Sequence, residues 1–248
     1  MIRYDDVMRD LAWDGYINAR SLGGLPTDLS RDGLTVHGRI ARGPRRERLT
    51  SVGWDEARRW GLRTVVDLRC PYEIGAREGD PSVDVKSLVD VSVVNAPTED
   101  QDDPEFRQTC FPILDSPEYW RHNWRLQPHL VRSALDAIAS AKPGVLVHCS
   151  AGRDRTGMIS ALLLGNAGVA PDAVAEDYVA SVRAMAGVAS HAPTEDRQAG
   201  WSRAEVDVWL RDKLTVVRDA VKDVQDVLDT LEVPTVTRQS LRAMLVGP

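Results

Sequence analysis

The chain has 248 residues, of which 43% are hydrophobic and 27% charged, and its formal net charge is −6. This length and composition suit one large α/β domain, or a domain with an appendage. The negative charge argues against general binding to nucleic acid or to anionic membranes, although a locally basic pocket is compatible with it.

The three cysteines, Cys70, Cys110 and Cys149, are scattered and odd in number, which is typical of a reducing compartment. The charged segment from Met1 to Asp10 lacks the apolar stretch of a signal peptide, and the longest apolar run, around 161–164, is too short to cross a bilayer. We therefore expect a cytoplasmic protein without integral membrane association.

Turns and basic residues dominate the first sixty positions. Leu34–His37 is predicted as an edge strand or hairpin arm. A helix is predicted to begin after Thr50 and to continue to Trp60. Between these elements lies a cluster of four arginines, for which a solvated loop is the favoured interpretation and a rim that attracts phosphorylated substrate the alternative. The four are Arg42, Arg45, Arg46 and Arg48.

The segment Thr64–Arg69 is predicted as a strand that ends in charged residues. Because ligands bind beyond the carboxyl ends of strands in parallel α/β sheets, Asp67 and Arg69 are expected on the same sheet edge as Cys149. We interpret them as an ion pair that braces the neighbouring loop, in preference to direct catalysis. Cys70 follows at once and is interpreted as a packed thiol, with a protective disulfide to Cys149 as the alternative.

The middle of the chain alternates between regular and turn-rich segments. Val83 to Val94 supplies another predicted strand, and the stretch from Ala96 to Glu105 is acidic and rich in turn residues. Pro117 to Ala141 is predicted to be largely helical, with Pro128 kinking or splitting the helix.

Ten residues, 148–157, connect a predicted strand at Val145–Val147 to a predicted helix that begins near Met158. A strand, a tight loop and a helix N-terminus form an anion-binding cradle, because successive N–H groups point inward and the helix dipole favours negative charge. Cys149 opens this loop and Arg155 closes it, with five residues between them. A thiolate and a planar guanidinium that face one oxyanion can transfer a phosphoryl group through a covalent cysteine intermediate.

The chemistry of a phosphate monoester, a dianion, assigns a role to each loop residue. Arg155 matches two equatorial oxygens better than a lysine would. Cys149 attacks as a thiolate, which requires a pKa well below the free value of about 8.5. His148 is expected to hold the loop by hydrogen bonds, and Thr156 to donate its hydroxyl to the thiolate. Asp154 is the first candidate for the general acid, and its carboxylate then activates water. The residues expected around the phosphate are Ser150, Ala151, Gly152, Arg153 and Thr156.

Helical segments follow the loop to the end of the chain. Pro171 to Ala184 is predicted as a helix with proline in its first turn, and residues 185–204 break the periodicity. Ala204 to Leu231 returns to helical spacing and is predicted as one helix. A last short helix is predicted at Thr237–Leu245, after Pro234.

The pattern His148-Cys149-x-x-Gly152-x-x-Arg155-Thr156-Gly157 resembles the signature of the cysteine-dependent protein tyrosine phosphatase superfamily. With Asp154 before the arginine, it is similar to the mycobacterial-type bacterial branch and to the myotubularin loop. Arg153 stands where that branch usually carries lysine, so charge is kept while selectivity for a second phosphate is expected to differ. Further blocks resemble that branch in the same order, namely Asn18–Gly24, Gly38–Gly43, Gly61–Arg69 with Glu73, Gly168–Val169 and Asp177–Ser181.

The resemblance implies an α/β fold in which helices flank a central, mostly parallel sheet. We expect a single phosphatase domain over residues 1–248, with a helical lid or insertion at 183–233, after the helix that follows the loop. Arg20, from the first matching block, joins His148, Asp67 and Arg69 as an implied supporting residue.

A mobile loop carries the general-acid aspartate in the classical members of this superfamily. The resemblance therefore makes Asp100, Asp102 and Asp103 rivals to Asp154, with Asp115 more distant. Asp154 is preferred because the loop fixes its position, and the other acidic residues then form a solvated turn.

The expected activity is metal-independent hydrolysis of phosphate monoesters by a protein tyrosine or dual-specificity phosphatase. No metal or other cofactor is expected, and the expected partner is a phosphorylated protein or a small phosphomonoester, with no nucleic acid. A phosphoinositide or small-metabolite phosphatase with the same mechanism is an alternative. A catalytically weak phospho-binding module is another, and the Cys-x5-Arg-Thr-Gly pattern argues against a rhodanese-like sulfurtransferase.

Overall fold

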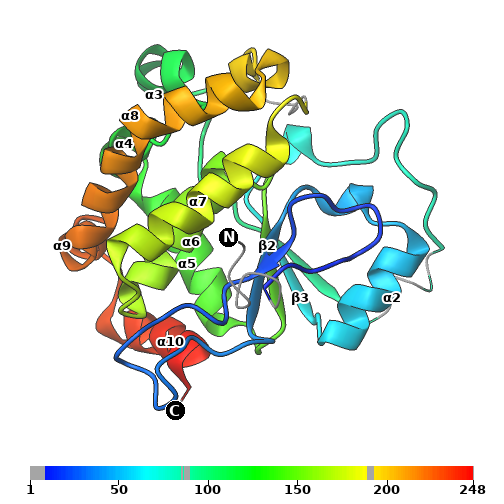
Figure 1. Cartoon of the computed structure of the whole chain (residues 1–248), viewed down its shortest axis with the longest axis horizontal. Coiled ribbons are helices and arrows are strands. Elements are labelled where there is room, and N and C mark those ends of the chain that lie inside the picture. The colour runs from blue at the N-terminus through cyan, green and yellow to red at the C-terminus, as the bar shows by residue number, and fades with distance from the viewer. Residues whose placement is uncertain (1–8, 85, 87–89, 189–192, 248) are drawn as a thin grey trace.

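The computed structural model describes residues 9–84, 86, 90–188 and 193–247, and it contains a five-stranded sheet in the order β1-β2-β5-β3-β4 (Figure 1). β1 pairs antiparallel with β2, whereas the other three pairings are parallel. The predicted α/β fold with a mostly parallel sheet is thus confirmed. The strands are β1 (Arg20–Ser21), β2 (Ile40–Gly43), β3 (Thr64–Asp67), β4 (Ser92–Asn95) and β5 (Val145–His148).

Alternate residues of the central strands face two different hydrophobic clusters, as the two-residue period of a strand requires. One face packs against α2 (Ser51–Trp60), which contributes Trp54 and Ala57. The opposite face is covered by a second layer, formed by the other α-helices. The sheet therefore lies between α2 and this layer (Figure 1). Ala41, Val65 and Leu146 point to the α2 side, and Ile40, Val66, Val145 and Val147 to the other.

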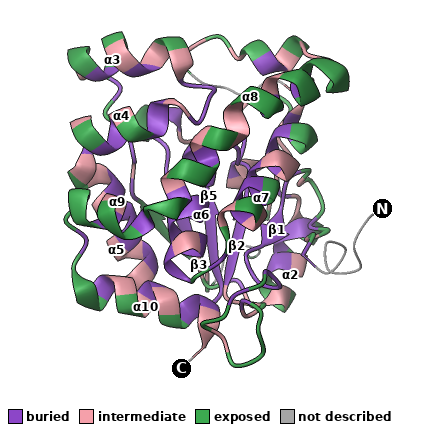
Figure 2. Ribbon diagram, turned by 60° about the vertical axis from the view of Figure 1, so that its left-hand side comes forward, coloured by how far each residue is buried: buried purple, intermediate pink, exposed green. Residues whose placement is uncertain are grey.

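The second face is covered by a set of helices whose outer surfaces are exposed and whose inner surfaces are buried (Figure 2). Among the described residues, none of these helices combines the length and the apolarity that crossing a lipid bilayer would require. The helices are α3 (Pro104–Cys110), α4 (Tyr119–Leu126), α5 (Pro128–Ser140), α6 (Asp154–Asn166), α7 (Pro171–Met185), α8 (Arg203–Lys222), α9 (Val224–Thr230) and α10 (Thr235–Val246).

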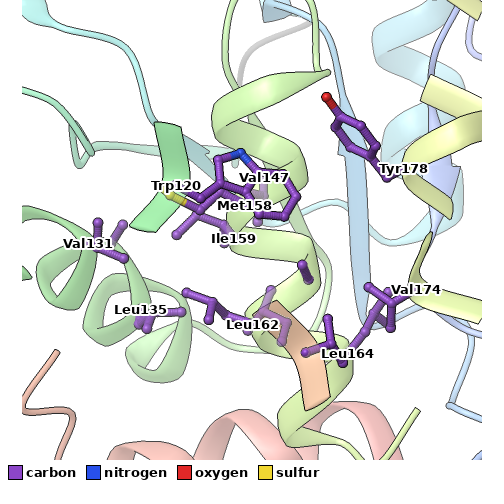
Figure 3. Close-up of a cluster of buried hydrophobic side chains, with 14 of the residues drawn as sticks. Trp120, Val131, Leu135, Val147, Met158, Ile159, Leu162, Leu164, Val174 and Tyr178 are labelled. Atoms are coloured by element: carbon purple, nitrogen blue, oxygen red, sulfur yellow. The ribbon is translucent and has the colours of Figure 1, made fainter. Parts of the chain in front are cut away.

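Helix α6 is the central helix of this layer, because every residue from Arg155 to Leu164 is buried. Trp120 and Tyr178 meet edge to face, with ring centroids 5.5 Å apart, and both rings lie against Gly157. A side chain at that position would collide with the tyrosine ring, since a Cβ would lie 3.0 Å from it. Figure 3 shows the apolar side chains of α6, including Met158, Ile159, Leu162 and Leu164, between those of α5 and α7.

Several predicted elements differ from the structure. The strand predicted within Val83–Val94 is limited to Ser92–Asn95, and part of the predicted range lies outside the described residues. Leu34–His37 forms only a single bridge, between Leu34 and Pro26, and no strand. The helix predicted over Ala204–Leu231 is interrupted at Asp223 and forms α8 and α9. The split at Pro128 is confirmed by α4 and α5.

The range 183–233, predicted as a lid or insertion, includes α8 and α9. The buried residues of α8 belong to the same hydrophobic cluster as those of α6, and α8 packs chiefly along α7. These two helices are therefore part of the main core. The short helix η5 (Arg197–Gly200) connects α7 to α8 and lies closer to the loop at 149–153.

Candidate active site

The predicted loop joins β5 to α6, with His148 as the last residue of the strand and Asp154 as the first residue of the helix. Gly152 has a φ of 69°, in the left-handed region that favours glycine. A Cβ at this position would lie 2.4 Å from the carbonyl oxygen of Gly43 in β2. The loop therefore approaches the neighbouring strand more closely than any other residue type at 152 would permit.

Cys149 and Arg155 line the same small cavity, of about 30 Å³, at the carboxyl edge of the sheet. Both are buried, with 3% and 6% of their surfaces exposed. This volume is about that of one water molecule, so a phosphorylated side chain needs more space than the cavity offers in this arrangement. The complete lining is Glu99, Leu114, Cys149, Ser150, Ala151, Asp154 and Arg155.

Glu73, in the short helix η2 (Pro71–Glu73), holds Arg155 in place. Nη1 of Arg155 donates to Oε2 of Glu73 at 2.5 Å and Nη2 donates to Oε1 at 2.7 Å. Oε2 of Glu99 lies 3.8 Å from Nη1. Burial opposes the charge of the guanidinium, but Glu99, to the extent that it is ionised, and Glu73 outweigh it and hold the pKa of Arg155 well above its usual value. Arg155 is therefore a permanent cation inside the cavity.

Asp154 lies on the cavity wall and is held by two neighbours. Nε of Arg153 donates to its Oδ2 at 2.9 Å, and the hydroxyl of Tyr178 donates to its Oδ1 at 3.4 Å. Burial raises the pKa of Asp154 above its usual value, although Arg153 acts in the opposite direction. A raised pKa keeps a larger fraction of the carboxyl protonated near neutral pH, as a general acid requires.

His148 precedes Cys149 and hydrogen-bonds through Nδ1 to the carbonyl oxygen of Cys149 at 3.0 Å. Burial lowers the pKa of His148, so the ring is neutral, and Nδ1 carries the proton because a carbonyl only accepts. Nε2 lies 3.6 Å from Oδ2 of Asp67. Asp67 in turn accepts from Nε and Nη2 of Arg69, at 2.8 and 2.7 Å. This is the ion pair next to the loop that the sequence led us to expect.

Arg20 supports the loop through the side chain of Asn18. Its Nη1 donates to Oδ1 of Asn18 at 2.7 Å, and Nδ2 of Asn18 donates to the carbonyl oxygens of Ala151 and Gly152 at 3.1 and 3.3 Å. The other amino group of Arg20 donates to the backbone of Asp177 at 2.8 Å. The first matching sequence block is thus the segment that holds the loop backbone.

Arg42 was not predicted to contribute, and the interpretation of its cluster as a solvated loop is wrong. Arg42 is 1% exposed, and its Nη2 donates to the carbonyl oxygen of Gly152 at 2.7 Å. Its Nη1 pairs with Asp177, which also pairs with Arg9 and Arg20. Two other members of the cluster form ion pairs, Arg45 with Asp80 and Arg46 with Asp67.

The acidic segment places a carboxyl in the cavity, but not one of the predicted rivals. Asp100 and Asp102 are exposed, and Asp103 caps α3 by accepting from the backbone N–H of Phe106 at 2.7 Å. Asp115 is buried against Arg197. The carboxyl that lines the cavity belongs to Glu99. Sequence reasoning missed it because only aspartates were compared, although Glu99 lies in the same acidic segment.

Three residues predicted to contact the phosphate lie outside the cavity lining: Gly152, Arg153 and Thr156. Arg153 is 1% exposed and divides its donors between Asp154 and Asp196, with Nη2 at 3.1 Å from Oδ1 of Asp196. The hydroxyl of Thr156 is buried and has no hydrogen-bond partner among the described residues, so its predicted bond to Cys149 is not formed. In this arrangement these residues support the loop, and only Ser150 and Ala151 of the predicted set line the cavity.

Cys70 is a packed thiol, as the favoured interpretation had it. Its Sγ donates to the carbonyl oxygen of Glu99 at 3.2 Å, and burial raises its pKa to about 12. Both Cys70 and Cys149 are free, so the alternative disulfide is not formed.

The segment around η5 covers the loop from the side of α7. Asp196 binds Arg153, and Arg197 pairs with Asp115. Gln198 is fully buried, and its Nε2 donates to the carbonyl oxygen of Asp115 at 2.7 Å. Leu114, the neighbour of Asp115, closes one wall of the cavity. These contacts place η5 and the segment at Leu114 beside the cavity that Cys149 lines.

Comparison with known proteins gives consistent matches. A family model described as the tyrosine phosphatase family matches residues 11–245. The triple specificity protein phosphatase PtpB of Mycobacterium tuberculosis is 30% identical over 172 residues, which cover 58% of this chain and 61% of that protein. A Cupriavidus necator protein assigned by its name to the tyrosine-protein phosphatases is 28% identical over 185 residues, covering 69% of this chain and 63% of its own length.

The aligned regions thus span less than two thirds of the length of these two relatives. Among solved structures, P. aeruginosa TpbA covers 75% of this chain and 88% of its own, at 18% identity and a TM-score of 0.36. That similarity is too distant for a comparison residue by residue.

Proposed function

The chain belongs to the tyrosine phosphatase family, and from this membership we propose that it hydrolyses phosphate monoesters through a covalent cysteinyl-phosphate intermediate. The single observation that supports the mechanism most strongly is the cavity shared by Cys149 and Arg155 at the N-terminus of α6. A nucleophilic sulfur and a permanent cation there face the space that a phosphoryl group would occupy.

In the first step, the thiolate of Cys149 attacks phosphorus. The sulfur–phosphorus bond forms as the phosphorus–oxygen bond to the leaving group breaks, and the electron pair of that bond goes to the leaving oxygen. The carboxyl of Asp154 donates its proton to this oxygen, which makes the leaving group a neutral alcohol or phenol. Arg155 and the loop bind the equatorial oxygens, whose charge is spread over the transition state.

In the second step, a water molecule attacks phosphorus from the side that the leaving group has vacated. The carboxylate of Asp154 accepts a proton from this water, the new oxygen–phosphorus bond forms, and the sulfur–phosphorus bond breaks. Cys149 leaves as a thiolate, inorganic phosphate is released, and Asp154 regains the protonated state that the next cycle needs.

The proposed substrates are phosphotyrosine and other phosphorylated side chains of proteins. The family supports phosphotyrosine, and the name of the M. tuberculosis relative, a triple specificity protein phosphatase, supports a wider range of phosphomonoesters. A phosphoinositide or a small phosphorylated metabolite would use the same chemistry and belongs in the same assay.

The decisive experiment compares the wild type with Cys149→Ser on an aryl phosphate, without added metal. We expect turnover to fall by at least about 10³-fold, because the hydroxyl is a poor nucleophile at its free pKa. In the wild type, rapid acid quenching and intact-protein mass measurement are expected to detect one phosphoryl group per chain. Peptide mass measurement after digestion is expected to place it on the peptide that contains Cys149. Undiminished activity of the variant would refute the assignment.

A substrate panel follows from the same assay, with phosphotyrosine, phosphoserine and phosphothreonine peptides, soluble phosphoinositides and phosphorylated sugars. A kcat/KM for phosphotyrosine peptides at least about tenfold above the others would support a tyrosine phosphatase. Comparable values on all peptides would support dual specificity, and a clear preference for a non-protein phosphate would overturn the proposed substrate class.

A further inference from the structure

Glu99 is the one ionisable residue on the cavity wall to which the mechanism above gives no role. It lies in the segment that follows β4, at the same sheet edge as the catalytic loop, and it is 2% exposed. Its Oε2 lies 3.8 Å from Nη1 of Arg155 and accepts from Nε2 of Gln101 at 2.6 Å. A phosphoryl group bound between Cys149 and Arg155 would share a cavity of about 30 Å³ with this carboxyl.

The charges around Arg155 do not need a second carboxylate. Glu73 already neutralises the guanidinium with two hydrogen bonds of 2.5 and 2.7 Å. An ionised Glu99 would therefore add an unbalanced negative charge to the buried site. It would also repel a phosphate dianion at short range, where a low dielectric makes the repulsion strong.

Of the groups that face Glu99 from the neighbouring elements, some favour its ionised form and some disfavour it. Arg155 of α6 and Gln101 of its own segment favour the ionised form, whereas Glu73 of η2 disfavours it. Tyr119 of α4 also favours the ionised form of Glu99, and burial together with Glu99 raises the pKa of Tyr119. Burial is the largest influence and the pKa of Glu99 is raised above its usual value. The thiols that interact electrostatically with it, Cys70 and Cys110, are neutral, because burial raises the pKa of each to about 12.

We propose that Glu99 is a phosphate-binding residue, which enters the site as a neutral carboxylic acid and donates a hydrogen bond to a phosphoryl oxygen. The protonated carboxyl adds a donor beside Arg155, and it does so without the charge that would oppose the dianion. When Glu99 ionises, the donor is replaced by a repelling carboxylate and affinity for the phosphoryl group falls. The assignment rests on the proposed function, because it concerns the same pocket, and Asp154 keeps its separate role at the leaving oxygen.

The test measures the binding of tungstate, a tetrahedral dianion, by calorimetry between about pH 6 and pH 9. The wild type is expected to lose up to about tenfold in affinity for each pH unit above the pKa of Glu99, because one proton is taken up on binding. The side chain in Glu99→Gln is neutral at every pH. The affinity of this variant for tungstate is expected to equal that of the wild type at the acid end of the range and to be at least about tenfold higher than that of the wild type at the alkaline end. Asp154→Asn serves as the matched control and is expected to keep a decline with the same midpoint as the wild type.

The proposal would be overturned if the affinity of Glu99→Gln for tungstate fell with rising pH in parallel with that of the wild type. It would also be overturned if this fall in affinity disappeared in Asp154→Asn and not in Glu99→Gln. If Glu99→Gln does not fold, Gln101→Met provides the second test. Loss of the amide donor disfavours the ionised form of Glu99, so the decline is expected to move to higher pH, and an unchanged midpoint would contradict the proposal. A wild type that neither binds tungstate nor hydrolyses aryl phosphates would instead refute the proposed function.

Discussion

Arg155 shows how a single residue can be buried, paired and still competent to bind an anion. Glu73 takes the two terminal nitrogens of its guanidinium, one donor from each. A guanidinium carries five N–H donors, so the edge that includes Nε is left for an oxyanion. Glu73 thus fixes the orientation of the guanidinium before any substrate arrives, which lowers the entropy cost of binding.

At the same scale, the pKa shift of Asp154 gives a prediction for Asp154→Asn. Because the protonated carboxyl is needed and its pKa is raised by burial, activity on poor leaving groups is expected to decline as the pH rises through that pKa. In kcat, measured with saturating ester so that the change in affinity assigned to Glu99 does not enter, the asparagine variant should lack this decline. Its kcat should be lower by about 10² to 10⁴-fold on phenyl phosphate, with a much smaller effect on p-nitrophenyl phosphate.

Steady-state kinetics on the two esters across the pH range provide the measurement. Asp102→Asn is the matched control, because Asp102 lies in the acidic segment but is exposed. Equal slowing on both esters would remove Asp154 from the role of general acid.

At the scale of elements, the loop owes its shape to strands and helices far away in the sequence. Asp177 of α7 lies at the centre of a buried cluster with Arg9, Arg20 and Arg42, and two of these arginines lead to the loop backbone. Burial opposes the ionisation of Asp177, but Arg42, Arg20 and Arg9 hold its pKa far below the usual value. The carboxylate is therefore a fixed counter-charge beneath the site.

Asp177→Asn is expected to destabilise the protein by about 3–5 kcal/mol, because it leaves three buried guanidinium groups without their common counter-charge. In the wild type, the stabilisation from a lowered carboxyl pKa is complete above the unfolded value of about 3.9 and is lost as the pH falls below it. Urea unfolding at neutral and acidic pH measures both effects.

The control for this prediction is Asp172→Asn in the first turn of the same helix, where the pair with Arg218 is largely exposed. We expect Asp172→Asn to lower the free energy of unfolding by about 0–1 kcal/mol. A similar cost for both variants would contradict the importance assigned to the buried cluster.

The elements that could be predicted from the sequence are those specified by local patterns. The strand, loop and helix at 145–166 are continuous in the chain, and their apolar periodicity and glycine positions identify them directly. The burial of Arg42 could not be predicted in this way, because its partner Asp177 lies 135 positions away. Glu99 lies in the acidic segment that the sequence singles out, but its position 3.8 Å from Arg155 follows only from the folded sheet edge.

At the scale of the whole molecule, contacts between η5 and the segment before α4 cover the cavity that Cys149 and Arg155 line. Asp115 and Gln198 form the most buried of these contacts, and Arg153 extends it to the loop through Asp196. The cover is therefore connected to the same side chain that holds Asp154, so opening and the position of the general acid are expected to be coupled.

Gln198→Ala is expected to weaken this cover and to increase the rate at which iodoacetamide modifies Cys149 by several-fold, because a buried hydrogen bond of about 0.5–1.5 kcal/mol is lost. Intact-protein mass measurement over time follows the reaction. Arg183→Ala is the matched control, since the exposed pair of Arg183 with Asp207 lies on the outer surface of α7 and α8. Equal rates in both variants and the wild type would show that the cover does not limit access.

The close approach of Gly152 to β2 brings the loop carbonyls within reach of side chains from other parts of the chain. Asn18 and Arg42 donate hydrogen bonds to the carbonyl oxygens of Ala151 and Gly152. An anion is therefore expected to meet a loop backbone whose shape the side chains of Asn18 and Arg42 already fix, so that less conformational freedom is lost on binding.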